Sequence, residues 1–290
     1  MDCSHGRPHF LTDRSRSRRG EPPGTFVVVD QLEPFEELLA RREPALDLAL
    51  ALIAAHGRDG VDPEPLVADL DRIADELGST SAAAGPEPLC AALFGPRGFR
   101  GDTAHYHDPR NSLLDQVLDR RLGIPITLSI LAVEVGRRLG VELLGIGMPG
   151  HFLVRDAHDD RAYFDPFRGG APMDPTACRA LFERLHGPRS RFRDEMLAPS
   201  TPREIVTRVL ANLRHAHMLE SDRSGLLRVV QLQSRLPGAG ITERRALAEL
   251  LAADGRFDEA ARLHRELSEL DPDPEQDHAT RALQLLARLN

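Results

Sequence analysis

Residues 108–166 read DPRNSLLDQVLDRRLGIPITLSILAVEVGRRLGVELLGIGMPGHFLVRDAHDDRAYFDP, and most of the fold can be argued from them. Near the end of this stretch, residues 151–155 have the composition of a strand, residues 156–160 that of a turn, and residues 161–165 that of a second strand. The order strand, turn, strand predicts a β-hairpin whose turn is centred on His158.

The predicted hairpin brings together two residues that are suited to acid–base chemistry. In this register His151 and Asp165 lie directly across the ladder from each other, with Cβ atoms roughly 5 Å apart. A carboxylate that faces an imidazole fixes its tautomer and raises its basicity, as in the base half of a nucleophile–His–Asp triad. The structural alternative is a buried hydrogen-bonded pair that stabilises the hairpin by roughly 1–3 kcal/mol.

A helix is predicted just upstream, over residues 126–139. Gly123 is a helix breaker, and Pro125 is suited to the first position of a helix. Apolar residues occur on every side of this helix, which is typical of a buried central helix. They include Ile126, Leu128, Ile130, Leu131, Val133 and Val135.

Four motifs carry a resemblance to a known family. They are YHDPRNS at 106–112, VLDRRLGIPITLS at 117–129, PGHFLVR at 149–155 and YFDPFRG at 163–169. With these motifs the sequence resembles the transglutaminase-like superfamily, and more closely the bacterial SirB-type family, over roughly residues 35–270.

This resemblance implies an α+β fold: a transglutaminase-like (papain-like) core with a helical N-terminal lobe, followed by C-terminal α-helical tetratricopeptide-like repeats. It also implies the order Cys, His, Asp for the catalytic residues. His151 and Asp165 match the His and Asp positions. The Cys position falls at about Pro125 to Thr127 and holds no thiol, as is usual in the SirB-type branch, which places transamidase or protease activity in doubt.

Two hydroxyls lie near the expected position of the nucleophile. A hydroxyl needs only a positioned base and an oxyanion hole to act as a nucleophile, so Ser129 and, less readily, Thr127 are candidates. Ser129 is expected about one turn inside the helix, where a small side chain commonly packs or bonds to a backbone carbonyl.

Ligand-binding candidates flank the same region. By strand alternation, Arg155 and Arg161 share the face of His151 and Asp165, and Arg168 lies nearby, so a small anion or carboxylate could bind there. Such arginines more often pair with acids of the same protein. Asn111 is a further ligand-binding candidate, although it or Ser112 could instead cap a helix over residues 113–121. The pair His105 and His107, on one face of a predicted strand, is a weak metal pattern without a third ligand.

The composition predicts an ordinary globular protein. Hydrophobic residues make up 41% of the 290 residues, and the formal net charge of −8 argues against general nucleic-acid binding. Three scattered cysteines indicate neither a disulfide framework nor a zinc site. The apolar stretches are too short to span a bilayer, and no secretory signal is recognisable, so we expect a cytoplasmic protein without membrane contact. No cofactor or metal is expected.

The chain is predicted to divide into three parts. Residues 1–24 have the composition of a disordered tail, residues 31–198 form the transglutaminase-like domain with its helical lobe, and residues 202–290 form the helical repeats. Helices are expected at 35–39, 44–55 and 63–77 in the lobe and from 202 onward in the repeats, where 241–272 fits a tetratricopeptide repeat and 276–289 a capping helix.

The resulting hypothesis is a non-catalytic, pseudoenzyme-like cytoplasmic scaffold or regulatory protein. It would bind a protein or peptide partner through its C-terminal repeats, with no nucleic acid involved and with an oligomeric state that the sequence does not specify. The alternative is a hydrolase or acyl-transfer enzyme that uses His151 and Asp165 with Ser129 or with an activated water.

Overall fold

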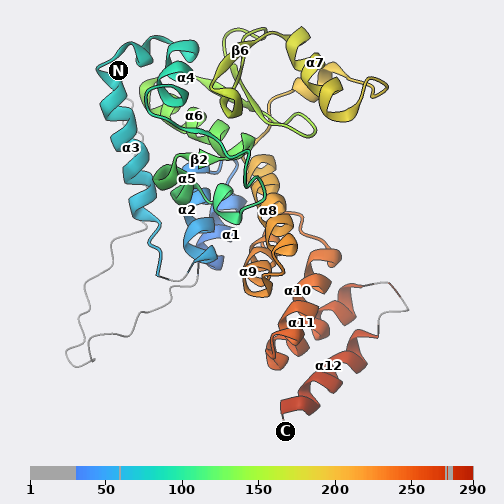
Figure 1. The fold of residues 1–290 in the computed structure, drawn as a ribbon. Coiled ribbons are helices and arrows are strands. Elements are labelled where there is room, and N and C mark those ends of the chain that lie inside the picture. Colours follow the sequence, from blue (N-terminus) through green and yellow to red (C-terminus); the bar gives the residue numbers. More distant parts are fainter. Residues whose placement is uncertain (1–30, 59, 272, 274–276, 290) are drawn as a thin grey trace, which may run out of the picture.

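The structure is a computed structural model, and it describes residues 31–58, 60–271, 273 and 277–289. The tail predicted at residues 1–24 therefore lies outside the described residues. Figure 1 shows a core of helices and short strands, from which the last helices extend toward the C-terminus. This mixture of helices with small sheets confirms the expected α+β class.

Four helices precede the core, and the three predicted in this lobe are confirmed. They are α1 (Leu32–Ala40), α2 (Leu46–Gly57), α3 (Glu64–Gly78) and α4 (Pro86–Phe94). Helix α3 shows why they fold in this way. Its apolar residues Leu66, Leu70, Ile73 and Leu77 recur at helical spacing and are all buried.

The predicted central helix is present as α6 (Pro125–Leu139), after the short α5 (Leu114–Arg120). Pro125 occupies its first turn, and Gly140 ends it in the left-handed conformation with φ of 73°. Helix α6 contacts α2, α3, α4 and α5 on the N-terminal side and two strands of the sheet on another side. It is therefore covered in nearly every direction, as its apolar composition requires.

An antiparallel sheet of four strands in the order β3-β4-β5-β6 lies against α6. Its strands are β3 (Leu143–Ile146), β4 (Leu153–Asp156), β5 (Tyr163–Asp165) and β6 (Ala171–Met173). Val154 and Phe164 belong to the main hydrophobic core with α6, whereas Leu153 and Tyr163 pack into a smaller core with α7 (Pro175–His186). A two-residue parallel pair joins β1 (Arg100–Gly101) to β2 (Leu122–Gly123).

The hairpin β4–β5 is confirmed, but its predicted register is wrong. Val154 pairs with Phe164 and Arg155 with Tyr163, which centres the turn on Asp159 instead of His158. The reason lies in the turn itself. The Asp156 carboxylate accepts a hydrogen bond from the His158 backbone at 2.8 Å, and the Asp159 carboxylate accepts one from the Arg161 backbone at 2.9 Å. These two Asx turns set the loop length and so the register.

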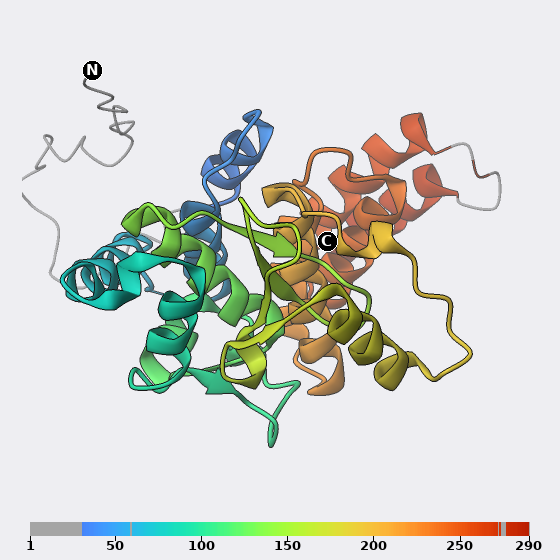
Figure 2. The same cartoon turned by 90° about the horizontal axis from the view of Figure 1, so that it is seen from above.

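The described residues from 202 onward are helical, as expected. It contains α8 (Pro202–Leu219), α9 (Arg223–Gln233), α10 (Ile241–Ala253), α11 (Phe257–Leu270) and α12 (His278–Leu286). The predicted cap of α8 is confirmed, because Thr201 and Glu204 form a capping box. Helices α8 and α9 bury Ile205, Val209 and Val229 in the main core, whereas α10 to α12 share a separate cluster. Seen from above, the C-terminal helices lie beyond the strands from the N-terminal helices (Figure 2).

Short 3-10 helices complete the description: η1 (Ser81–Ala84), η2 (Pro109–Asn111), η3 (Pro166–Arg168), η4 (Asp194–Leu197) and η5 (Ala287–Leu289). None of the helices in the described ranges combines the length and the apolar character that crossing a membrane requires.

A buried ionic cluster fixes the C-terminal end of α6 to the N-terminal lobe. Arg138 lies within 2.6 Å of Asp47, 2.8 Å of Asp71 and 2.8 Å of Glu134, and its side chain is only 9% exposed. Burial raises the pKa of Glu134, and the nearby Asp47 acts in the same direction. The guanidinium of Arg138 is the buried cation of this cluster, and the exposed Arg137 compensates Asp47 and Glu134 from the solvent side.

We expect Arg138→Ala to lower the free energy of unfolding by roughly 3–5 kcal/mol, because it removes the buried cation that joins Asp47, Asp71 and Glu134. Arg137→Ala is the matched control. The neighbouring Arg137 contacts the same Asp47 and Glu134, but its side chain is 58% exposed, so its loss should cost less than about 1 kcal/mol. Urea denaturation of both variants checks this, and equal losses would contradict it.

Candidate functional site

A tight turn at residues 148–151 positions His151. The His151 backbone N–H donates to the Met148 carbonyl at 3.0 Å, with Pro149 and Gly150 at the two central positions. Gly150 has φ of 74°, which glycine adopts without strain. A Cβ at this position would lie 2.8 Å from Nε2 of His186. Both the backbone conformation and the available space therefore require glycine.

Two helices from later in the chain hold this turn. His186, the last residue of α7, places Nε2 3.0 Å from the Pro149 carbonyl oxygen. On α8, Nη2 of Arg208 donates to the carbonyls of Met148 at 3.0 Å and of His151 at 2.7 Å. The position of His151 thus depends on α7 and α8 as well as on the hairpin.

His151 and Asp165 do form the predicted side-chain pair. Nε2 of His151 lies 3.0 Å from Oδ1 of Asp165, and both side chains are buried. The Phe167 backbone N–H donates to the same Oδ1 at 3.1 Å, and Nε of Arg168 lies 3.7 Å from Oδ2. Since His151 precedes β4 and is not opposite Asp165 in the ladder, the contact is made across the end of the strands. It leaves Nδ1 of His151 available on the other side of the ring.

The expected position of the nucleophile, at the start of α6, is filled by residues with other contacts. Pro125 has no reactive group. The Thr127 hydroxyl donates to the Asn111 carbonyl at 2.7 Å and accepts from the Ile124 N–H at 3.1 Å. The side chain of Thr127 is fully buried and therefore acts as a structural link between α6 and η2.

Other nucleophile candidates are also turned away from the imidazole. The buried Ser129 hydroxyl lies 3.5 Å from the Phe152 carbonyl oxygen, and no hydroxyl among the described residues is hydrogen-bonded to the ring of His151. Burial raises the pKa of the Cys90 and Cys178 thiols to about 12 each, so neither supplies a thiolate near neutral pH. Cys3 lies outside the described residues.

A cavity of about 140 Å³ lies between the first turn of α6 and His151. It is lined by Tyr106, Ile124, Pro125, Ile126, Gly150, His151, Phe152, Arg208 and Asn212. Sequence reasoning missed Arg208 and Asn212 because it assigned α8 to the helical repeats. The available signal was their spacing: both are polar residues four apart within the run of buried apolar residues that α8 packs onto the core.

None of the arginines that the sequence suggested for binding an anion (Arg155, Arg161 and Arg168) lines this cavity. Arg155 pairs with Tyr163 in the ladder, and its buried Nε has no hydrogen-bond acceptor. Arg161 is exposed in the turn outside β5. Arg168 stays near Asp165 at a half-exposed position.

Asn111 has a structural position. Its Nδ2 donates to the His105 carbonyl at 2.7 Å, and its Oδ1 accepts from Nη1 of Arg120 at 3.1 Å. The prediction that Asn111 or Ser112 caps the following helix is wrong. The residue at the cap of α5 is Leu113, and no side chain caps that helix, because the amide of Asn111 is already bonded to the preceding loop.

The predicted strand at residues 105–107 is also wrong, since this segment forms a bend and a turn. The Asp102 carboxylate accepts from the His105 N–H at 2.9 Å, and the His105 carbonyl accepts from the Asp108 N–H at 3.0 Å, which closes the loop. The side chain of His105 is 78% exposed, and the His107 ring packs edge-on against His215. The described residues contain no group of three or more His, Cys, Asp or Glu side chains that could hold a metal ion.

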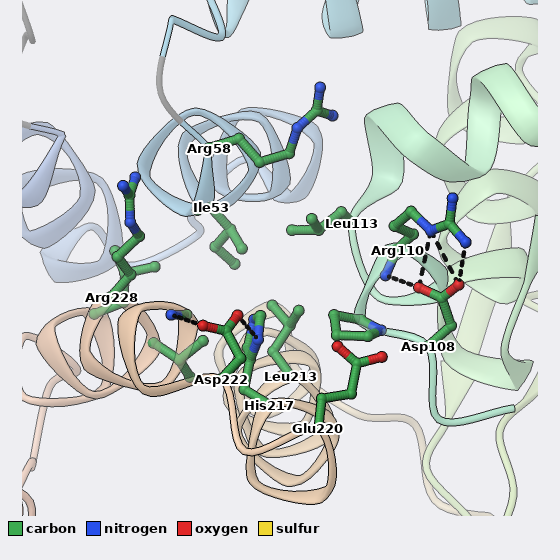
Figure 3. Close-up of a pocket in the computed structure, with 15 residues that line it drawn as sticks. Ile53, Arg58, Asp108, Arg110, Leu113, Leu213, His217, Glu220, Asp222 and Arg228 are labelled. Carbon is green, nitrogen blue, oxygen red and sulfur yellow. Dashed lines mark hydrogen bonds and ion pairs between the residues drawn. The ribbon is translucent and has the colours of Figure 1, made fainter. Parts of the chain in front are cut away.

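A second cavity, of about 360 Å³, lies between α2, η2, α8 and α9. In Figure 3, Ile53, Leu113 and Leu213 form its apolar wall, and charged residues surround it. Several of these charges are already paired within the rim. Arg110 donates to the Asp108 carboxylate, and Nδ1 of His217 lies 2.9 Å from Asp222. This cavity has its own pair, His217 with Asp222, but neither His151 nor Asp165 lines it, and none of its lining residues belongs to α6.

The fold and the His–Asp pair together define a class. A histidine bonded to an aspartate of an antiparallel sheet, beside the start of a buried helix, is the framework of the cysteine, histidine and aspartate triad of transglutaminase-like proteins, here without the cysteine. A family model of the transglutaminase-like superfamily matches residues 64–211. The match contains α6, His151, Asp165 and Arg208.

Known proteins agree with this class. A UPF0162 protein of Pseudomonas aeruginosa is 32% identical over 227 residues, which are 77% of this chain and 83% of that protein. A UPF0162 protein of Xylella fastidiosa is 44% identical over 135 residues, 45% of this chain and about half (48%) of that relative. F-box only protein 21 of Mus musculus is 35% identical over 98 residues, which are only 16% of its length. The chain belongs to the transglutaminase-like superfamily, together with the UPF0162 proteins.

The turn that holds His151 can be tested at Gly150. We expect Gly150→Ala to cost about 1–2 kcal/mol for the left-handed backbone and about 1 kcal/mol more, because the new Cβ displaces His186 from the Pro149 carbonyl. Gly169→Ala is the control: it has φ of 79° but no neighbour within 4 Å of the added Cβ. Urea denaturation in a His186→Ala background should abolish the difference between the two variants. A difference that persists there contradicts the explanation.

Proposed function

We propose that this chain is a non-catalytic transglutaminase-like protein that acts by binding, as a cytoplasmic scaffold or regulatory protein. The observation that carries the proposal is the start of α6. The position of the nucleophile holds Pro125, Ile126 and Thr127, and the only hydroxyl among them is bonded on both sides to backbone groups.

A triad without its nucleophile cannot form a covalent acyl intermediate. Covalent acyl transfer needs an activated thiol or hydroxyl within hydrogen-bond reach of the base. Thr127 would have to break two buried hydrogen bonds to reach His151, and Ser129 faces a backbone carbonyl. The remaining His151–Asp165 pair therefore supports a bound group or the hairpin better than it supports transamidation.

Support for a protein or peptide partner comes from the C-terminal helices. Their spacing fits tetratricopeptide-like repeats, in line with a SirB-type architecture, and such repeats commonly present a surface to a peptide or a partner helix. Leu270 on α11 and Leu283 on α12 are 52% and 69% exposed, although both are large apolar residues. We infer that these exposed leucines contribute to the surface that a protein partner contacts.

One observation favours an enzyme as the second candidate. The His–Asp hydrogen bond is intact and borders a cavity, so His151 could activate a water for hydrolysis. This candidate lacks an identified oxyanion hole and acyl acceptor, which is why we rank it second.

The activity test uses the full-length chain with a glutamine donor peptide and a labelled amine. Incorporation of the amine and release of ammonia should both equal those of His151→Ala, since no nucleophile reaches the imidazole. Turnover by the unmodified chain that is lost in His151→Ala would overturn the non-catalytic proposal.

The partner test compares Leu283→Glu with His151→Ala. A partner bound by the unmodified chain should still bind His151→Ala and should be lost with Leu283→Glu, because the charge interrupts the exposed apolar surface of α12. Circular dichroism checks that Leu283→Glu remains folded. A partner that binds all three proteins equally would exclude this surface of the C-terminal helices.

A further inference from the structure

The cavity beside His151 gathers polar side chains whose hydrogen-bonding groups are only partly used inside the protein. Arg208 and Asn212 reach it from α8, Tyr106 from the loop before η2, and His151 from its turn. Polar groups that converge on one concave site with unused donors or acceptors are typical of a ligand-binding site. The chemistry of these groups indicates what such a ligand would be.

Arg208 supplies the positive charge of the cavity. Only Nη2 is used internally, for the two carbonyls of the His151 turn, while Nε and Nη1 have no acceptor among the described residues. No carboxylate in the described part of the chain lies within 4 Å of its guanidinium, although Arg208 is partly buried and stacks on the Phe152 ring at 5.3 Å. Burial lowers the pKa of Arg208, which reflects the cost of removing this charge from water. Charges removed from water are normally paired, and no carboxylate of the described residues pairs with this guanidinium.

The other groups complete a set rich in hydrogen-bond donors. Asn212 lies one turn after Arg208 on α8, and its amide has no partner among the described residues. Tyr106 is 40% exposed at the rim of the cavity. Burial raises the pKa of its hydroxyl, and the nearby charge of Arg208 acts in the opposite direction. Nδ1 of His151 faces away from Asp165. The Asn212 amide and the Tyr106 hydroxyl offer N–H and O–H groups to an acceptor, whereas Nδ1 of a neutral His151 that donates from Nε2 to Asp165 is itself an acceptor.

The acids of the neighbourhood do not compete for Arg208. Asp165 lies behind the imidazole and is bonded to it. Asp102 is bonded to Arg120, and Asp108 is bonded to Arg110. The excess of positive charge at the cavity is therefore not neutralised by the protein.

We propose that this cavity binds a carboxylate, with Arg208 as its counter-ion and Asn212 and Tyr106 as further donors. The inference rests on the proposed function in one respect, that the site binds a group instead of transforming it. A water molecule occupies about 30 Å³ in the liquid, so a cavity of about 140 Å³ has room for a carboxylate and a few carbon atoms. The carboxylate would belong either to a free small acid or to the end of a peptide.

Titration calorimetry at low ionic strength tests the carboxylate with matched probes. Propionate and a dipeptide with a free C-terminus are compared with propionamide and the amidated dipeptide, which have the same shape without the charge. Binding of propionate identifies a free acid, and binding of the dipeptide acid alone identifies a peptide end. Equal binding of acid and amide, or no binding of either acid, would overturn the inference.

Variants assign the site to Arg208. Arg208→Gln and Asn212→Ala should each weaken binding of the acid at least about tenfold, while Arg203→Gln should leave it unchanged. Arg203 is a matched control, because it lies on α8 and donates to a backbone carbonyl, that of Leu39 at 2.8 Å, but is not in the cavity. Asn212→Ala keeps the test open if Arg208→Gln fails to fold, since the side chain of Asn212 makes no hydrogen bond among the described residues. Unchanged affinity in folded variants would overturn the assignment.

The two proposals fail separately. Amine incorporation by a protein that also binds propionate would overturn only the non-catalytic function. Absence of acid binding in a protein without activity would overturn only the carboxylate site.

Discussion

The burial of helix α6 is the constraint on which the rest of the structure depends. Because this helix is apolar on nearly every side before its last turn, it must be covered in nearly every direction. The N-terminal helices, the antiparallel sheet and α8 each cover part of it. At its first turn the covering layers leave a cavity, to which the turn before β4 contributes His151 and α8 contributes Arg208. The packing of the core around α6 therefore also determines where the site lies.

The site also shows what remains of a triad without its nucleophile. The base and its aspartate are still bonded, and the turn that carries the base is held by a carbonyl contact from α7 and two from α8. Three side-chain contacts from two other helices are more than a turn needs if its role is only to connect strands. A bound anion that contacts Arg208 would link the position of His151 to the presence of a ligand, because the same guanidinium holds the His151 carbonyl.

Prediction from the sequence worked where one local signal was strong. The helices of the lobe, α6 with its initial proline, the hairpin and the cap of α8 follow from periodicity, proline and glycine placement and side-chain caps. Prediction failed where two local signals competed. Two aspartates in the hairpin turn shifted the register, and a carboxylate at Asp102 closed residues 105–107 into a turn where alternation alone favoured a strand. Asn111, a good capping residue by type, was already bonded elsewhere.

By itself the sequence determined the elements, the buried helix and the meeting of His151 with Asp165, because these depend on residues close together in the chain or on a short hairpin. Only the tertiary structure decided which residues line the cavity beside His151. Arg208 and Asn212 lie more than fifty residues after His151, on a helix whose own pattern indicates only which face is apolar. The role of a polar residue on such a helix depends on which groups of the neighbouring layer lie opposite it. Tertiary packing decides which groups those are.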